Sequence, residues 1–333
     1  MKTYQYDVVA LGELLIDFTE SGISEQGNPI LEANPGGAPC NVLAMLAKLG
    51  HQTAFIGKVG NDMFGKQLRD TLVEAGIGTD GLLIDDAVHT TLAFVHTGVD
   101  GDRSFSFCRN PGADMMLVPE EVDTTMIQSS RIFHFGTLSM THASCREATK
   151  KALSIARESG CIISFDPNLR EPLWENLEQA KEQTLYGLSF CDVLKISDNE
   201  IRWLTGEQDY DKGVAWIRER FDIPFILVSL GKEGSMAYSK SGFASVPAFI
   251  RDDTIETTGA GDTFCGCILH SVLQYGLIDY TEKQLSNMLT FANAAASIIT
   301  TRKGALRVMP EESEVLHVMQ HGKALLNPND ENA

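Results

Sequence analysis

From about residue 130 onward, short apolar segments alternate with longer segments whose apolar residues recur at helical spacing. The apolar segments are 131–136, 161–166, 192–196 and 225–230, and the helical segments include 142–159, 199–204 and 211–221. Alternation at this spacing predicts βαβ units, in which parallel strands form one sheet and helices cover both of its faces. The pattern therefore constrains this part of the chain to an α/β fold.

The first third of the chain departs from this alternation. Residues 6–11 form an apolar strand, but the next helical segment, 39–49, starts only after a polar and glycine-rich gap. Two later strand-like stretches flank the sequence GVDGD, which is typical of a β-hairpin turn. Strands from about 12–36 and 90–110 can pair into a small lid over the edge of the main sheet where ligands bind. Separate surface hairpins are the alternative.

The length and the charge of the chain predict how many domains it has, which partners it does not bind and where it is located. The 333 residues predict one domain over 1–326 and a frayed tail over 327–333. The net charge of −18 disfavours nucleic-acid and membrane-surface partners, because an acidic surface repels phosphate groups. Asp7, Glu13 and Asp17 interrupt the apolar run that a signal peptide needs, so we expect a cytoplasmic location.

The segment TTGAGDTFCGCIL, residues 257–269, contains the clearest chemical motif. Gly259, Ala260 and Gly261 lack bulk, and the apolar run that follows predicts a helix. Backbone N–H groups at the start of a helix form an anion site suited to phosphate. A carboxylate such as that of Asp262 repels phosphate, so its presence at this site suggests a catalytic role. It would accept a proton from the group that attacks the phosphate. The alternative is that Asp262 is an ordinary N-cap residue of the helix.

A second glycine-rich segment lies near the N-terminus. Gly36 and Gly37 precede the helical segment 39–49, and Asn41 falls in its first turn, where an amide could face a ligand. By itself, a Gly-Gly pair before a helix usually marks only a turn.

Together, the two segments resemble the N-terminal and C-terminal signatures of the ribokinase-like (PfkB) carbohydrate kinase family, and the resemblance covers nearly the whole chain. It implies a three-layer α/β sandwich with a mostly parallel central sheet and a small β lid. Segments 109–117, 133–140, 166–174 and 195–206 are most similar to those of fructokinases.

The resemblance implies an ATP-dependent phosphotransferase that acts on an alcohol group, with Mg²⁺ as a second cofactor. Asp262 would be the general base, and the backbone of Gly259, Ala260 and Gly261 would form the anion hole. By the same resemblance, the substrate-binding residues are Asp17, Gly36, Gly37, Asn41, Arg109 and Arg170, and the nucleotide-binding residues are Ser229, Gly231, Gly234 and Asn293. Glu200 would hold Mg²⁺ through water.

Two positions depart from the family pattern. Ser197 stands where the family's N-x-x-E motif has asparagine, and Glu256 stands where the aspartate before TTGAGD is usual. The longer Glu256 carboxylate would distort a K⁺ pocket and prefer solvent or an arginine, so we expect weak potassium dependence. Lys195 and His134 are interpreted as structural residues.

The resemblance favours a fructokinase that makes fructose 6-phosphate. A 2-keto-3-deoxygluconate kinase is the alternative within the family, although Asp114 would oppose an anionic substrate. A catalytically silent sugar-sensing protein is the alternative outside enzymes. The resemblance also leaves open a homodimer that forms through the lid.

Overall fold

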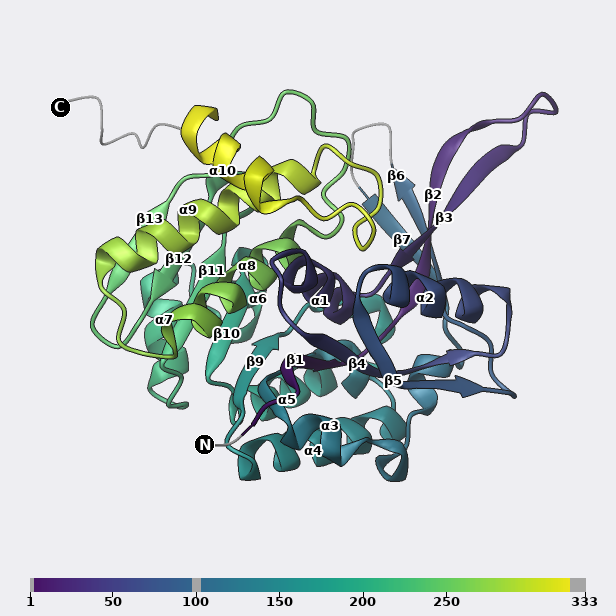
Figure 1. Cartoon of the computed structure of the whole chain (residues 1–333), viewed down its shortest axis with the longest axis horizontal. Coiled ribbons are helices and arrows are strands. Elements are labelled where there is room, and N and C mark those ends of the chain that lie inside the picture. The colour runs from purple at the N-terminus through teal and green to yellow at the C-terminus, as the bar shows by residue number, and fades with distance from the viewer. Residues whose placement is uncertain (1–2, 98–102, 324–333) are drawn as a thin grey trace.

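The computed structural model describes residues 3–97 and 103–323. Its centre is a nine-stranded sheet with the order β13-β12-β11-β10-β9-β8-β1-β4-β5, in which only β12 runs antiparallel to its neighbours (Figure 1). The strands are β1 (Tyr6–Leu11), β4 (Thr53–Gly60), β5 (Ile77–Asp85), β8 (Ser130–Gly136), β9 (Ile162–Asp166), β10 (Val193–Ser197), β11 (Phe225–Ser229), β12 (Ser235–Tyr238) and β13 (Phe243–Val246). The predicted, mostly parallel α/β sheet is confirmed.

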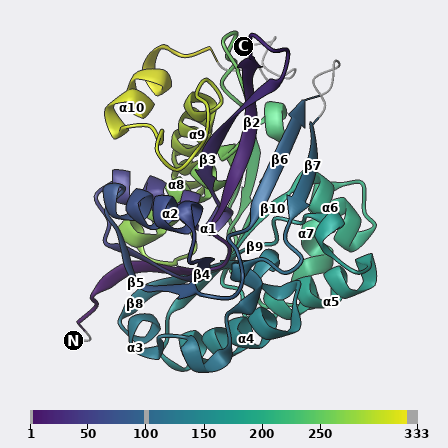
Figure 2. The same ribbon diagram turned by 90° about the vertical axis from the view of Figure 1, so that its right-hand side faces the viewer.

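Helices cover both faces of this sheet. One face carries α1 (Ala38–Lys48), α2 (Met63–Glu74), α8 (Ala260–Tyr275), α9 (Glu282–Ile299) and α10 (Glu312–His321). The other carries α3 (Thr124–Gln128), α4 (Ala143–Glu158), α5 (Leu177–Leu188), α6 (Asp198–Thr205) and α7 (Tyr210–Arg218) (Figure 2). The result is the three-layer sandwich that the sequence predicted. Among the described residues, no helix is long and apolar enough to span a membrane.

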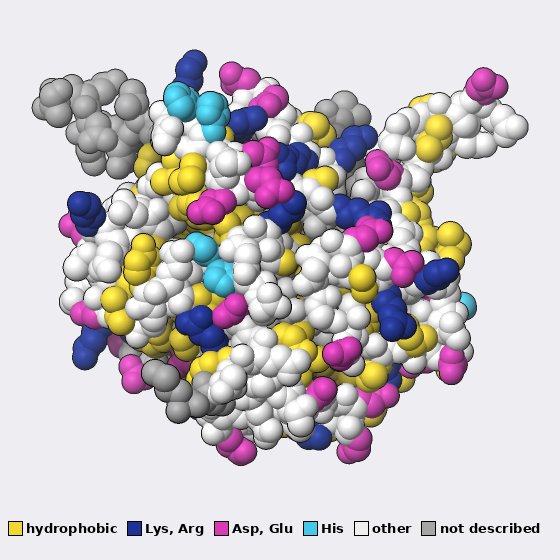
Figure 3. Space-filling model, viewed as in Figure 1, with side chains coloured by type: hydrophobic (Ala, Val, Ile, Leu, Met, Phe, Trp, Pro, Cys, Tyr) yellow, Lys and Arg dark blue, Asp and Glu magenta, His cyan; other side chains and the backbone are white. Residues whose placement is uncertain are grey.

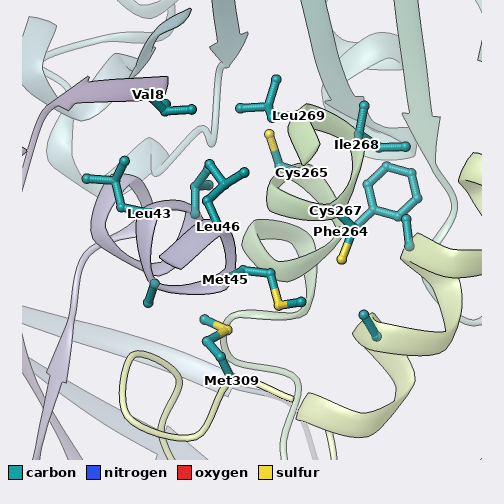
Figure 4. Close-up of a cluster of buried hydrophobic side chains, with 14 of the residues drawn as sticks. Val8, Leu43, Met45, Leu46, Phe264, Cys265, Cys267, Ile268, Leu269 and Met309 are labelled. Carbon is teal, nitrogen blue, oxygen red and sulfur yellow. The ribbon is translucent and has the colours of Figure 1, made fainter. Parts of the chain in front are cut away.

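The central strand β1 shows how the two cores form. Its side chains alternate across the sheet, so Val8 and Ala10 join the core beneath α1 and α8, whereas Val9 and Leu11 join the core above α4. Figure 4 shows the first core, where side chains of α1 and α8 interdigitate. At Gly266 a Cβ atom would lie only 2.8 Å from the Cβ of Met45, so glycine permits this close approach.

A second, smaller sheet stands over one edge of the sandwich. It has the order β3-β2-β6-β7, from β2 (Leu15–Ile23), β3 (Pro29–Gly36), β6 (Leu92–Thr97) and β7 (Arg103–Cys108). The two early excursions of the chain therefore pair into one lid and are not separate hairpins. The predicted turn within GVDGD and the tail over 327–333 lie outside the described residues. The β2–β3 hairpin projects far from the body and carries hydrophobic side chains (Figure 3).

Candidate active site

The lid and the sandwich enclose a cavity of about 400 Å³. The lid supplies Leu15, Asp17, Val95 and Phe107 to its wall. The sandwich supplies residues from the strand ends and from the first turns of α1 and α8, namely Glu13, Gly37, Ala38, Asn41, Leu138, Asn168, Arg170, Lys195, Thr257, Thr258, Gly259, Gly261 and Asp262. The cavity thus lies where ligands bind in open α/β folds, and it contains most of the residues that the sequence predicted for catalysis and sugar binding.

Asp262 lies in the first turn of α8, beside this cavity. The N-cap of α8 is Gly259, at φ +77°, so the interpretation of Asp262 as the N-cap residue is wrong. Its Oδ2 instead accepts a hydrogen bond of 2.8 Å from Nδ2 of Asn41, which joins the two sequence motifs. Burial raises the pKa of Asp262, while Asn41 and the positive charge of Lys195 oppose that shift.

The predicted anion hole is the start of α8. A Cβ on Gly259 would lie 2.5 Å from that of Ala305, and its positive φ also favours glycine. The N–H of Ala260 donates to the carbonyl oxygen of Thr257 at 3.3 Å. Gly259 and Gly261 line the cavity, whereas Ala260 is not among its lining residues.

The Gly-Gly pair shapes the sugar side of the cavity. A Cβ on Gly36 would lie 2.2 Å from Oδ2 of Asp17, so glycine is required for that carboxylate to lie where it does. Gly37 has φ +124°, and a Cβ there would lie 2.4 Å from the backbone oxygen of Glu13. Burial raises the pKa of Asp17 to about 7, helped by Glu256 and Asp262 and opposed by Arg170.

The two predicted arginines have different surroundings. Arg170 lines the cavity. Arg109 is buried outside the lining, and its Nη2 forms an ion pair of 2.7 Å with Asp114 Oδ2, to which Nε also donates. Nη2 donates in addition to the Leu138 carbonyl, and Nη1 donates to Thr141 Oγ1. The structure therefore does not bring Arg109 to the sugar site. The negative charge of Asp114 is neutralised by Arg109, so Asp114 would not repel an anionic substrate as the sequence suggested.

Glu200 lines an adjoining cavity of about 290 Å³ together with Ser197 and Lys195. Its Oε2 accepts hydrogen bonds from the N–H and hydroxyl of Ser197, and its Oε1 accepts one from the N–H of Leu169. Burial alone would raise the pKa of Glu200, but Lys195 and these hydrogen bonds hold it below its ordinary value. Ser197 thus fixes Glu200 directly at the position where the family has asparagine.

The predicted nucleotide-binding residues lie around β11–β13, outside the lining of either cavity. Ser229 ends β11 opposite Ser197 of β10, and Gly231 and Gly234 follow in the turn before β12. The side-chain amide of Asn293 binds protein groups: Oδ1 accepts a hydrogen bond from the Ser235 hydroxyl at 2.9 Å, and Nδ2 donates to the backbone oxygens of Val246, which ends β13, and Pro247. Its contact with adenine stays a prediction.

Two charged residues of the cavity wall were missed as functional candidates. Lys195, interpreted from the sequence as structural, lines the cavity, and its Nζ forms an ion pair of 2.9 Å with Asp166 Oδ2. Glu13 is buried, and its Oε1 accepts the N–H of Ala38 at 2.9 Å, which satisfies the start of α1 where the N-cap Gly37 has no side chain. His134 is enclosed and contacts Ser164, in line with its structural interpretation.

The carboxylate of Glu256 does not extend into solvent or bind an arginine in any hydrogen bond or ion pair of the described residues, so that expectation is wrong. The residue is buried, and its Oε1 accepts the N–H of Gly304 at 2.8 Å. The carboxylate therefore connects the segment before α8 to the segment after α9.

The chain belongs to the pfkB family of carbohydrate kinases, because the family's model matches residues 5–312. It is accordingly a phosphotransferase that acts on a sugar hydroxyl.

Individual relatives agree with this assignment. The chain is 40% identical to probable fructokinase-2 of Arabidopsis thaliana, over 94% of this chain and 95% of the relative. Its structure resembles that of the fructokinase of Xylella fastidiosa with bound ATP, with a TM-score of 0.86, 34% identity, and coverage of 95% of this chain and 98% of the other. It also resembles a fructokinase of Vibrio cholerae O395 in a fructose, ADP and calcium ion bound form, with a TM-score of 0.83, 28% identity, and coverage of 94% and 99%.

Proposed function

We propose that the chain is an ATP-dependent fructokinase that makes fructose 6-phosphate, with Asp262 as the general base. The observation that carries the assignment of the base is the hydrogen bond of Asp262 to Asn41 at the wall of the cavity, beside the glycine-rich start of α8. The relatives named fructokinases, which share about 40% identity over most of the chain, support the choice of sugar.

In the proposed phosphoryl transfer, the protein accepts one proton and positions the two substrates. The oxygen of the sugar 6-hydroxyl forms a bond to the γ-phosphorus of ATP, the bond from that phosphorus to the oxygen of ADP breaks, and the hydroxyl proton passes to Asp262. A general base must be within hydrogen-bond reach of the proton it takes, and Asp262 faces the cavity where the sugar would lie. Catalysis of phosphoryl transfer then depends mainly on positioning and charge.

The wall of the cavity favours a neutral sugar. Its carboxylates Glu13, Asp17 and Asp262 can accept hydrogen bonds from sugar hydroxyls. Two cations, Arg170 and Lys195, line the same cavity, and Lys195 is already paired with Asp166. A 2-keto-3-deoxygluconate kinase would need an arginine to hold the substrate carboxylate; of the two predicted arginines only Arg170 lines this wall, beside the three carboxylates.

Mg²⁺ fits the cavity beside Glu200 when it is bound through water and the phosphates of ATP. Glu200 already accepts three protein hydrogen bonds, so water-mediated contact suits it better than direct ligation. Among the described residues, no group of three His, Cys, Asp or Glu side chains is placed to hold a metal ion. Mg²⁺ at phosphoryl-transfer sites is usually held by one or two carboxylates, water and the substrate phosphates. When bound, the ion would neutralise charge on the phosphate oxygens.

We also propose that the chain forms a homodimer through the lid. Ile23, Ile30 and Leu31 are exposed on the projecting β2–β3 hairpin, and a second copy could cover them. The mass in solution, measured for the wild type and for Ile23→Ser/Ile30→Ser, tests this proposal, since a lid dimer should dissociate in the variant. The cytoplasmic location stays a prediction from the sequence.

A coupled ADP-release assay tests the proposed activity on fructose, ribose, 2-keto-3-deoxygluconate, adenosine and mannose. Fructose should give the highest kcat/KM. Asp262→Asn should lower kcat by about 100-fold or more, with little change in the KM for fructose. A preference for 2-keto-3-deoxygluconate would contradict the substrate, and near-normal kcat in Asp262→Asn would contradict the role of the base.

A further inference from the structure

We propose that Lys195 is a further catalytic residue, whose ammonium group contacts the transferring phosphoryl group at the start of α8 and neutralises part of its charge. The proposal rests on the function proposed above, in which the phosphoryl group is received by the backbone around Gly259 and Gly261. It gives a chemical role to a side chain that the sequence analysis had interpreted as structural.

The position of the ammonium group supports this role. Lys195 extends from β10 and lies under the first turn of α8, so that a Cβ on Gly261 would be only 3.1 Å from its Nζ. Its Nζ therefore lies next to the backbone proposed as the anion hole. Lys195 lines both the 400 Å³ cavity that contains Asp262 and the 290 Å³ cavity that contains Glu200. It stands where a phosphoryl group would pass between the two.

The surrounding charges create the need for a cation. Asp166, Glu200 and Asp262 all act electrostatically on Lys195. A phosphoryl group that enters this region meets their negative field, and the local cations that can offset it are Lys195 and Arg170. Burial alone would lower the pKa of Lys195, but the three carboxylates raise it well above its ordinary value, so the ammonium stays charged.

Asp166 holds the ammonium group of Lys195 in place and leaves N–H donors for another acceptor. The carboxylate ends β9, is buried, and binds Nζ through Oδ2 while its Oδ1 accepts the N–H of Asn168. An ammonium has three N–H donors, so one bond to Asp166 leaves capacity for another acceptor. A buried ion pair adds little stability compared with apolar residues of similar volume, so stability alone gives weak reason for this pair.

The main test is a pair of variants that separates a catalytic role from a structural one. Lys195→Met removes the cation, and Lys195→Met/Asp166→Asn removes both charges, so that no buried carboxylate is left without its partner. We expect both variants to lose about 100- to 1,000-fold in kcat, the range seen when one group that stabilises transition-state charge is removed. The KM for fructose should change by less than about threefold, because the sugar contacts remain. Lys195→Arg, which keeps the positive charge, should have a kcat at least tenfold higher than that of Lys195→Met.

Lys58 offers a matched control. It is also buried in a parallel strand, and it forms ion pairs with Glu121 and Asp85, but it lies outside the lining of both cavities. Lys58→Met should unfold at a lower temperature than the wild type and keep kcat within about threefold. The comparison separates loss of a buried lysine from loss of a cation at the reaction centre.

A binding measurement gives a readout besides turnover. In the wild type, fluoride and aluminium should strengthen the binding of MgADP in the presence of fructose by at least tenfold, because the planar fluoride complex resembles the transferring phosphoryl group. Lys195→Met/Asp166→Asn should lose most of this gain while it binds MgADP alone as the wild type does. The fluoride gain does not depend on a chemical step.

The outcomes distinguish the two proposals. If Lys195→Met/Asp166→Asn keeps kcat within threefold of the wild type and retains the fluoride gain, Lys195 is only the structural partner of Asp166. If the wild type phosphorylates no sugar, or Asp262→Asn keeps its activity, the proposed function itself fails. If Lys195→Met does not fold, the charge-neutral double variant and Lys195→Arg still decide the question.

Discussion

Buried carboxylates at the cavity differ from exposed ones in their protonation. Burial raises the pKa of Glu13 to about 7 and that of Asp17 to about 7. At neutral pH the ligand-free protein therefore holds part of these groups in the protonated form. A hydroxyl-rich ligand that donates hydrogen bonds to a carboxylate stabilises its ionised form, so binding of the sugar should release protons.

Asp17 gives a prediction at the scale of one residue. If it accepts hydrogen bonds from two sugar hydroxyls, Asp17→Ala should cost about 2–4 kcal/mol of transition-state binding, because those hydroxyls would be left without partners. Steady-state kinetics should show kcat/KM for fructose reduced about 30- to 1,000-fold. A change of less than fivefold would show that Asp17 does not contact the sugar.

The site residues also show what sequence could and could not supply. Asn41 and Asp262 were predicted although 221 positions separate them, because each belongs to a motif and the structure joins them. Lys195 begins the fructokinase-like segment 195–206, but neither Lys195 nor Glu13 belongs to a signature with a known chemical role, and the fold decides that both are buried beside the cavity. Arg109 was predicted to bind the sugar from its matching position, but that position does not reveal that the guanidinium is bound to Asp114 and lies outside the cavity lining.

At the scale of elements, there are physical reasons why the sequence pattern does not predict some of the strands. β4 is buried along its entire length, so it shows no alternation of polar and apolar residues. β12 and β13 contain four residues each, which is too short for a period to emerge. The segments from β8 to β11 were predicted because clear helices separate them. The lid was predicted because its two hairpins interrupt that order.

The start of α1 gives a prediction about an element. At Gly37, φ is +124° and a Cβ would lie 2.4 Å from the Glu13 carbonyl, so Gly37→Ala must move the first turn that carries Asn41. We expect the free energy of unfolding to fall by about 1–3 kcal/mol and the KM for fructose to rise. Gly50→Ala is the control, because Gly50 also has a positive φ, of +84°, but a Cβ there meets nothing within 4 Å. Denaturant unfolding and kinetics of both variants measure the difference, and equal KM values would contradict the argument.

The segments before α8 and after α9 give a prediction about potassium. Glu256 connects them through the Gly304 N–H, so its carboxylate already has a backbone partner and does not depend on a cation there. We expect potassium to change the rate by less than about tenfold, or about 1.4 kcal/mol. Activity in buffer free of sodium and potassium, and then with KCl at constant ionic strength, measures this. Strong activation would show that Glu256 still completes a cation site.

For the whole molecule, the raised pKa values predict how stability depends on pH. A carboxyl whose pKa is higher in the folded state binds more protons there than in the unfolded chain. The stability contributed by Glu13 and Asp17 is therefore present below about pH 4 and is lost as the pH rises through about 7. The net charge of −18 acts in the same direction, because carboxylates that ionise add to self-repulsion. Asp7 and Glu200 have lowered pKa values and therefore stabilise the fold as the pH rises. This stabilisation is already complete once the pH exceeds the pKa of an ordinary carboxyl, so it does not change between pH 5 and pH 8.

We therefore expect the Tm of the ligand-free protein to fall between pH 5 and pH 8, and to fall less in Glu13→Gln/Asp17→Asn, which removes two of the titrating groups. Glu175→Gln/Glu182→Gln is the control, because both side chains are exposed and the net charge changes by the same amount. Calorimetric scans at constant ionic strength compare the three proteins. If the control flattens the curve as much as the cavity variant does, the loss of stability comes from the overall charge. If only the cavity variant flattens it, the loss comes from the carboxyls that the lid and the sandwich bury together.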